Sequence, residues 1–170
     1  GVIHNLRLPK EAGEGKIEKI RIGYDGNYYL TAGAVTIKVD KSNWTSKVLK
    51  MSARDICVIS PTRSILVVGN GVLILNSENF ENQYISKSYL KGPNAGHLIP
   101  NVKASGIYAS EFSNNIYIYG LFGVKLLKGT TLESIMSNHD YLANNINRAI
   151  ETKDGLQCFA SNIYGVIIVY

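Results

Sequence analysis

Two histidines and an aspartate are the residues of this sequence best suited to acid–base or metal chemistry. His97 and His139 lie in two polar connecting segments, and Asp140 directly follows the second of them. If the fold brought them together, imidazole and carboxylate groups could exchange a proton or bind a metal ion. A third histidine, His4, lies in an apolar-alternating segment and is interpreted as structural. Because two histidines without a fixed spacing are weak evidence, the sequence favours a protein that is not an enzyme.

The other residues that could carry chemistry lead to the same expectation. Cys57 and Cys158 lie in apolar stretches, where free cysteine acts as a small buried hydrophobe, and they lack metal-site spacing. No G-x-S-x-G motif occurs, and "GNGV" at 69–72 lacks the third glycine of a dinucleotide-binding fingerprint and is interpreted as a hairpin turn. Asp25 and Asp154 occupy equivalent turns and are interpreted as turn formers. We therefore predict no catalytic residues, no metal and no cofactor.

Composition places the chain among globular, strand-rich proteins. Its 170 residues correspond to a single domain, 45% of them are hydrophobic, and eleven tyrosines favour strands. The net charge is +5, but no run of basic residues forms the clustered face that nucleic-acid binding usually needs. No apolar run approaches the roughly 18 residues of a membrane span. These features leave the compartment open, with the cytoplasm slightly favoured.

A repeat is the strongest signal in the sequence. Each unit reads as an apolar strand, a polar turn, a second strand, a glycine-containing turn and a third strand. The four units span residues 20–39, 56–75, 107–127 and 149–169. Their third strands are expected to begin at Val35, Val72, Val124 and Val166, of which the last three directly follow a glycine. Glycine suits these turns because it reaches positive φ without a Cβ clash.

A fourth strand is expected after each of the first three units. Pairs of large apolar residues four positions apart recur there, namely Trp44 with Val48, Phe80 with Tyr84, and Leu132 with Met136. Such pairs share one face of a strand, although "TLESIM" at 131–136 could instead form a short helix. Four short antiparallel strands repeated every roughly 40 residues are typical of the blades of a β-propeller.

Two of the units resemble those of known propellers. "YDGNYYLTAGAVTIKVD" and "KDGLQCFASNIYGVIIV" are similar to the repeats of two-component-regulator-type and NHL-type propellers, with turn residues before the second strand and glycine before the third. The resemblance implies a single all-β domain over 1–170, with four-stranded antiparallel blades near 16–50, 51–90, 103–138 and 145–170. Residues 1–8 are expected to supply the missing outer strand of the last blade.

Two questions of architecture stay open at this point. The four blades either close a small circle by themselves or form part of a larger propeller that another chain or a further segment completes. The competing architecture is a β-sandwich or barrel with a similar number of strands. It would explain the alternation of apolar and polar residues, but not the common register of the four valines.

Function is expected in the connections between units, because loops carry recognition on a rigid strand scaffold. The connections from 84 to 107 and from 136 to 150 are the longest and are predicted to open on one rim. Their candidate partner-binding residues are Tyr89, Lys91, Asn94, His97, Lys103, His139, Asp140 and Tyr141. Tyrosine gives large contact area at low entropic cost, so Tyr89, His97 and Tyr141 are the expected anchors.

We predict a non-enzymatic, propeller-type binding or scaffold module that recognises another protein, or a further propeller segment, through this rim. The first alternative is a carbohydrate-binding, lectin-like propeller, in which repeated pockets would make weak sugar sites useful. Further alternatives are a nucleic-acid-binding propeller, which the scattered charge makes unlikely, and an enzymatic propeller that uses the histidines.

Overall fold

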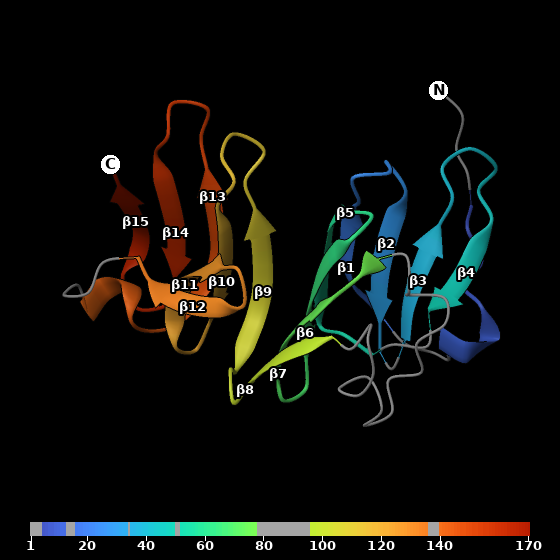
Figure 1. Cartoon of the computed structure of the whole chain (residues 1–170), viewed down its shortest axis with the longest axis horizontal. Coiled ribbons are helices and arrows are strands. Elements are labelled where there is room, and N and C mark those ends of the chain that lie inside the picture. The colour runs from blue at the N-terminus through green and yellow to red at the C-terminus, as the bar shows by residue number, and fades with distance from the viewer. Residues whose placement is uncertain (1–4, 13–15, 34, 50–51, 78–95, 136–139) are drawn as a thin grey trace.

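The protein is an array of four antiparallel β-sheets, as Figure 1 shows for the computed structural model. The structure describes residues 5–12, 16–33, 35–49, 52–77, 96–135 and 140–170. Within these ranges three sheets have four strands and the last has three, and the strands of each sheet pair in chain order. The all-β fold predicted from the sequence is confirmed, and its strands form four antiparallel sheets.

The strands are short and regularly spaced. Sheet 1 consists of β1 (Ile17–Ile22), β2 (Tyr28–Ala32), β3 (Val35–Val39) and β4 (Ser46–Leu49). Sheet 2 consists of β5 (Asp55–Ser60), β6 (Arg63–Val68), β7 (Gly71–Leu75) and β8 (His97–Pro100). Sheet 3 consists of β9 (Ala104–Ala109), β10 (Ile116–Gly120), β11 (Gly123–Lys128) and β12 (Thr131–Ser134). Sheet 4 consists of β13 (Ile146–Glu151), β14 (Gln157–Ser161) and β15 (Gly165–Val169), and the 3₁₀ helices are η1 (Lys10–Ala12) and η4 (Asp140–Leu142).

The predicted first residue of the third strand is confirmed at Val35, whereas β7, β11 and β15 begin one residue earlier, at the glycine. The predicted common register of the four valines therefore holds in sheets 2 to 4 and is shifted by one residue in sheet 1. Val72, Val124 and Val166 each occupy the second position of the third strand, after a glycine. Val35 is instead the first residue of β3, so that Thr36 is their equivalent. The shift arises because the glycine of sheet 1, Gly33, lies within the turn and does not begin the strand.

The observed fourth strands differ from their predicted positions more than the third strands do. Strand β8 is the fourth strand of sheet 2, so this unit extends to Pro100 and not to residue 90. The predicted strand residues Phe80 and Tyr84, like Met136, lie outside the described residues. In sheet 3, residues 131–134 form a strand, as preferred over a helix. In sheet 1, Trp44 precedes β4 and stacks on Tyr28 with 5.9 Å between the ring centroids.

The start of the described chain covers sheet 1 and forms no strand with sheet 4. Leu6 and Leu8 pack against the cluster formed by Leu30, Ala32, Ile37 and Val39 on the outer face of β2 and β3. The prediction that residues 1–8 complete the last unit is therefore wrong for residues 5–8, while residues 1–4 lie outside the described ranges. The physical reason is that the outer face of sheet 1 offers apolar residues that no other sheet covers.

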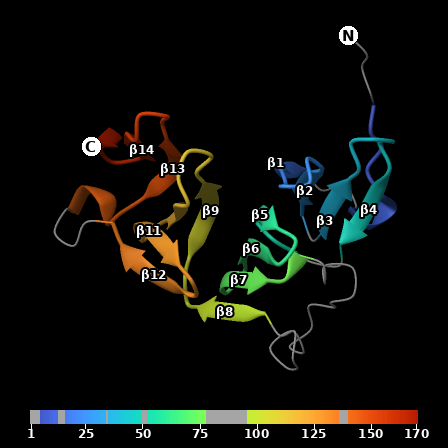
Figure 2. The same ribbon diagram turned by 45° about the horizontal axis from the view of Figure 1, so that its top comes forward.

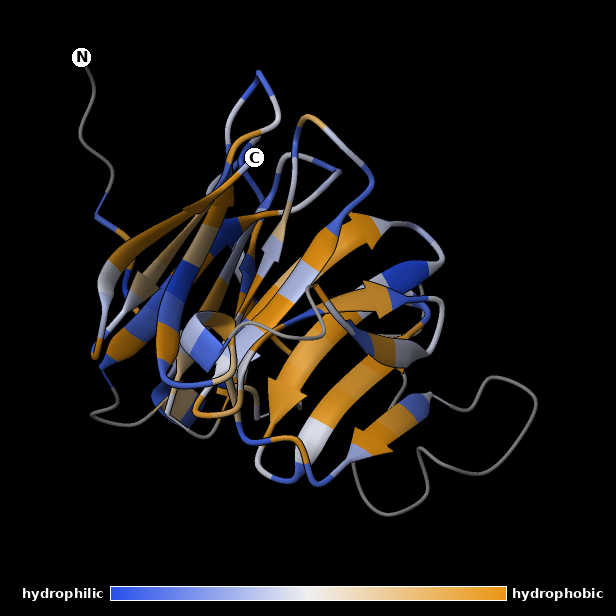
Figure 3. Cartoon of the chain, turned by 90° about the vertical axis from the view of Figure 1, so that its left-hand side faces the viewer, coloured by the Kyte–Doolittle hydropathy of each residue, from blue (hydrophilic) through white to orange (hydrophobic). Residues whose placement is uncertain are grey.

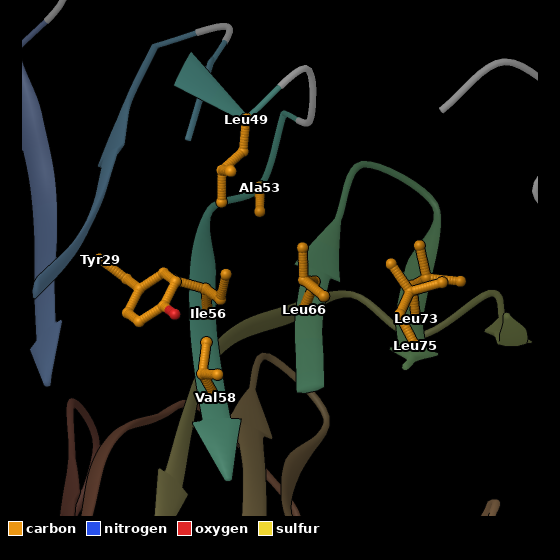
Figure 4. Packing of buried hydrophobic residues seen from close by; sticks show 8 residues of the cluster. All are labelled: Tyr29, Leu49, Ala53, Ile56, Val58, Leu66, Leu73 and Leu75. Atoms are coloured by element: carbon orange, nitrogen blue, oxygen red, sulfur yellow. The ribbon is translucent and has the colours of Figure 1, made fainter. Parts of the chain in front are cut away.

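The four sheets pack face to face in chain order. Figure 2 shows them along an arc, from sheet 1 at the right to sheet 4 at the left. At each interface the first strand of one sheet packs against the first and second strands of the sheet before it. One apolar cluster fills each interface; the cluster between sheets 1 and 2 brings Tyr29 and Leu49 against Ile56 and Leu66 (Figure 4). Apolar residues gather on the strands, while most connections are polar (Figure 3).

An ion pair joins the first strands of three successive sheets. Arg21 of β1 donates from Nε to Asp55 Oδ1 at 2.9 Å and from Nη2 to Oδ2 at 2.6 Å. Its Nη2 also donates to the carbonyl oxygen of Ile107 in β9 at 3.2 Å, and the Ile107 N–H donates to Asp55 Oδ2 at 2.9 Å. The Asp55 side chain is fully buried, and a buried charge needs a partner. Arg21 and the Ile107 N–H compensate it.

Candidate functional site

Because successive strands run in opposite directions, the connections between them lie at two opposite ends of the array. Rim A carries the turns between second and third strands and the connections from one sheet to the next. Rim B carries the turns between first and second strands and those between third and fourth strands. Backbone hydrogen bonds follow this division: Asn101 N–H donates to Asn70 on rim A, and Tyr24 N–H donates to Val58 on rim B.

The predicted site residues do not share one rim. His97 is the first residue of β8, at rim B, because β7 ends at Leu75 on that rim and β8 runs antiparallel to β7. Lys103 follows β8 and lies, exposed, at rim A, as do Asp140 and Tyr141 of η4. The expectation of a single rim is thus wrong for His97. It failed because the fourth strand of sheet 2 follows the long insertion and does not precede it. Tyr89, Lys91, Asn94 and His139 lie outside the described residues.

Tyr141 belongs to an exposed aromatic cluster at rim A. Its ring meets the ring of Tyr164 edge to face, with 4.8 Å between centroids and an interplanar angle of 82°. Both tyrosines are exposed, and so are the neighbouring turn residues Leu121 and Ile163. The cluster is therefore assembled from three segments that are separate in sequence: the turn 121–122, helix η4 and the turn 162–164.

Backbone contacts hold these three segments together. The Asn145 N–H donates to the carbonyl oxygen of Leu121 at 3.2 Å, and the Asn162 N–H donates to the carbonyl oxygen of Asn145 at 3.2 Å. Leu142, next to Tyr141, is buried in the cluster between sheets 3 and 4 together with Val124. Tyr141 is thus presented on a short helix whose other side is anchored in the core, which limits the freedom of the exposed ring.

Amide side chains lie next to the aromatic cluster. Asn147 and Asn162 exchange hydrogen bonds between their side-chain amides, and both residues are exposed or nearly so. The site therefore offers aromatic faces, apolar turn residues and amide donors and acceptors within one surface. Sequence reasoning identified Tyr141 but missed Tyr164. The signal available for Tyr164 was its position directly before Gly165, because turns usually carry small or polar residues there.

A second group of polar side chains lies at rim B, between sheets 3 and 4. The Glu151 carboxylate accepts hydrogen bonds from Tyr117 Oη at 2.9 Å, Ser113 Oγ at 2.9 Å and Asn115 Nδ2 at 3.4 Å. Burial alone would raise the pKa of Glu151, but these hydrogen bonds to the charged form outweigh it and lower the pKa. Burial, together with the Glu151 carboxylate, raises the pKa of Tyr117, which therefore remains a hydrogen-bond donor.

Asp25 forms a similar but more exposed group in sheet 1. Its carboxylate accepts from the Asn27 N–H at 3.1 Å, from Tyr29 Oη at 3.0 Å and from Lys38 Nζ at 2.9 Å. Burial would raise the pKa of Asp25, but the bonds from Lys38, Asn27 and Tyr29 lower it overall. The Asn27 bond closes the turn between β1 and β2, which agrees with the interpretation of Asp25 as a turn former. Both acidic groups thus serve the packing of the sheets.

The Glu151 group predicts a pH-dependent contribution to stability. Because the folded-state pKa of Glu151 is lowered below its usual 4.5, its contribution is complete above that pH and is lost as pH falls through the folded-state value. Glu151→Gln should lower the free energy of unfolding by about 1 kcal/mol at pH 7. The deficit should shrink toward pH 3 in urea denaturation. Exposed Glu133→Gln is the control and should show no such trend; a constant deficit at all pH values would contradict the assignment.

The described residues contain neither a candidate metal site nor a membrane-spanning helix. In those ranges no three His, Cys, Asp or Glu side chains are grouped so that they could hold a metal ion. In the same ranges no helix has the length and apolar character needed to cross a membrane. The two cysteines are free and half-buried.

Comparison with known proteins supports the fold. No family model matches the sequence, and no curated protein matches it. Among 28 solved chains that match are two structures of the extracellular domain of BT4673 from B. thetaiotaomicron, a protein ascribed to the one-component systems in one case and to the hybrid two-component systems in the other. They align with TM-scores of 0.65 and 0.66 at 14% and 15% identity, over 92% and 98% of this chain. The chain spans only about a fifth of their length, 20% and 21%. At this identity the likeness concerns the fold.

Proposed function

We propose that the chain is a non-enzymatic binding module with a β-propeller arrangement, which recognises another protein through rim A. The radial arrangement is supported by the order of the sheets: first strands β1, β5, β9 and β13 follow one another in contact, as the inner strands of propeller blades do. The ion pair of Arg21 and Asp55 lies among these inner strands and reaches Ile107, which supports a common centre.

The exposed Tyr141–Tyr164 cluster is the observation that carries the proposed binding function. The rings of Tyr141 and Tyr164 contact each other, and the exposed Leu121 and Ile163 lie in turns that backbone hydrogen bonds join to the same rim. Aromatic residues fixed on a rigid scaffold are the usual anchors of protein interfaces, because little side-chain entropy is lost on binding. Exposed apolar patches of this kind commonly mark interaction sites.

The solved neighbours suggest the biological setting of the module. Both BT4673 structures are extracellular domains of a protein ascribed to the one-component or the hybrid two-component systems. We propose that this chain belongs to an extracellular sensory domain of the same architecture, in place of the cytoplasmic setting that composition slightly favoured. In this setting the rim would present a recognition surface, and the sheets would provide its support.

Removal of both aromatic rings tests the binding function. Tyr141→Ala/Tyr164→Ala should weaken partner binding by about 30-fold or more, because truncation of even one hot-spot residue costs about 2 kcal/mol. The measurement is chemical crosslinking of the immobilised chain to extracellular proteins of its source, followed by titration of the captured protein against both forms. Circular dichroism should be unchanged, because both side chains are exposed.

Tyr24→Ala is the matched control, because Tyr24 is equally exposed but lies at rim B. Equal loss of binding in the control and the double variant, or full binding by the double variant, would place recognition elsewhere.

Carbohydrate is the second candidate ligand, favoured by the amides of Asn147 and Asn162 beside the aromatic rings. A glycan array that shows binding dependent on the two tyrosines would select it over protein.

A further inference from the structure

The first strands of the four sheets line the concave side of the array, where Figure 2 shows β1, β5, β9 and β13. Each is irregular at the same place, near its rim A end. The extra residue of the bulge is Glu18 in β1, Ser105 in β9 and Asn147 in β13. Before β5, the Arg54 N–H donates to the carbonyl oxygen of Val67, the partner of the next residue, in the same arrangement. All four residues are polar and exposed, and repeated bulges commonly redirect side chains beside functional sites.

The residue that follows each bulge occupies an equivalent position in all four sheets. The strand registers place Lys19, Asp55, Gly106 and Arg148 there. The Asp55 carboxylate is already bound by Arg21, as described above. In the part of the chain that the structure describes, neither Lys19 nor Arg148 forms an ion pair. Two cations at equivalent positions of sheets 1 and 4 therefore have no carboxylate partner among the described residues.

These two cations influence each other across the concave side. Burial lowers the pKa of Lys19, and the positive charges of Arg148 and Arg21 lower it further. The carboxylates of Asp55 and Glu18 act in the opposite direction but do not reverse the shift. Lys19 and Arg148 come from the first and the last sheet, so their long side chains approach each other from opposite sides of the arc. An anion between them would lower the electrostatic energy of both.

We propose that Lys19 and Arg148 together bind the negatively charged group of a small ligand, a carboxylate, sulfate or phosphate group. A guanidinium binds such oxyanions through two parallel hydrogen bonds, and an ammonium adds a compact charge. Arg148 uses one N–H for the carbonyl oxygen of Asn147, which leaves several of its five donors for the ligand. The exposed hydroxyl of Ser105, at the same level of β9, is a further donor.

Titration of the purified chain with three simple anions tests this site. Sodium sulfate, sodium phosphate and sodium glucuronate are added at constant ionic strength, and backbone amide chemical shifts report binding. Saturation at one site is expected, with the largest shifts in β1 and β13. Lys19→Gln and Arg148→Gln should each weaken binding by about tenfold or more, because each removes a charged hydrogen bond. Lys153→Gln is the matched control: it removes the same charge from an exposed turn at rim B and should leave binding unchanged.

A fourth variant separates local electrostatics from an effect on structure. Glu18→Gln removes the carboxylate next to Lys19 and should strengthen binding by about threefold. Preference for glucuronate would identify a carboxylate ligand, and preference for sulfate or phosphate an ester of that acid; both agree with the proposal. A shift that grows linearly without saturation, or equal weakening by Lys153→Gln, would show only general attraction of anions and overturn it. Tyr141→Ala/Tyr164→Ala should keep anion binding, so this site is tested independently of rim A recognition.

Discussion

Replacing Asp55 with alanine is expected to lower the free energy of unfolding by about 3 kcal/mol. The change leaves the Arg21 guanidinium without its partner among the inner strands and leaves the Ile107 N–H without its acceptor. Removal of one member of a buried pair costs about 3–5 kcal/mol, and the lower end applies because the Arg21 side chain is 33% exposed. Urea denaturation followed by tyrosine fluorescence measures the change.

Two further variants separate the charge effect from simple loss of packing. Asp154→Ala removes an exposed turn aspartate and should change stability by no more than about 0.5 kcal/mol. Arg21→Met/Asp55→Leu removes both charges and should recover a large part of the loss, because apolar replacement of a buried pair is often tolerated. An Asp55→Ala variant within about 1 kcal/mol of the unmodified chain would show that the pair does not stabilise the three inner strands.

Replacing Gly123 with alanine is expected to destabilise the chain by about 3 kcal/mol or more. Gly123 has φ +91°, which alanine rarely adopts, and a Cβ there would overlap the carbonyl oxygen of Leu142. The chain would have to move η4, which carries Tyr141, so the variant should also lose partner binding. Thermal denaturation and the binding titration report the two effects.

Gly165 provides the matched control, because it begins the third strand of sheet 4 at an equivalent position. It has φ +76°, but no atom lies near a Cβ added there. Gly165→Ala should therefore cost only the backbone strain, about 1 kcal/mol. Equal costs at the two positions would show that the contact with Leu142 is unimportant and that φ alone requires glycine.

The sequence predicted the antiparallel strands and their hairpins because their determinants are local. Alternation, turn residues and glycine lie within about twenty residues of each other, and each hairpin can be recognised separately. The fourth strand of sheet 2 could not be found in this way. Strand β8 has only four residues, His97–Pro100, and a long insertion separates it from β7. The closing role predicted for the segment 1–8 is wrong for residues 5–8 for a similar reason, since an apolar alternating segment does not identify the face that it covers.

The candidate site was only partly predictable. Tyr141 was identified from the composition of its segment, but its contact with Tyr164 depends on how sheets 3 and 4 approach each other. Arg21 and Asp55 are separated by 34 residues and have no sequence signature as a pair. Side chains that meet through sheet packing carry no spacing signal in the sequence.

The contacts of Arg21 with two other sheets affect the cooperativity of unfolding. In a linear array of units that touch only their neighbours, the end unit can open while the others stay folded, because its loss removes one interface. Arg21 of sheet 1 contacts both Asp55 of sheet 2 and the backbone of Ile107 in sheet 3. Opening of the first unit therefore leaves the buried Asp55 carboxylate of sheet 2 without its cationic partner. This link raises the free energy of local opening at that end, and the amide protons of the first three units are therefore expected to exchange together.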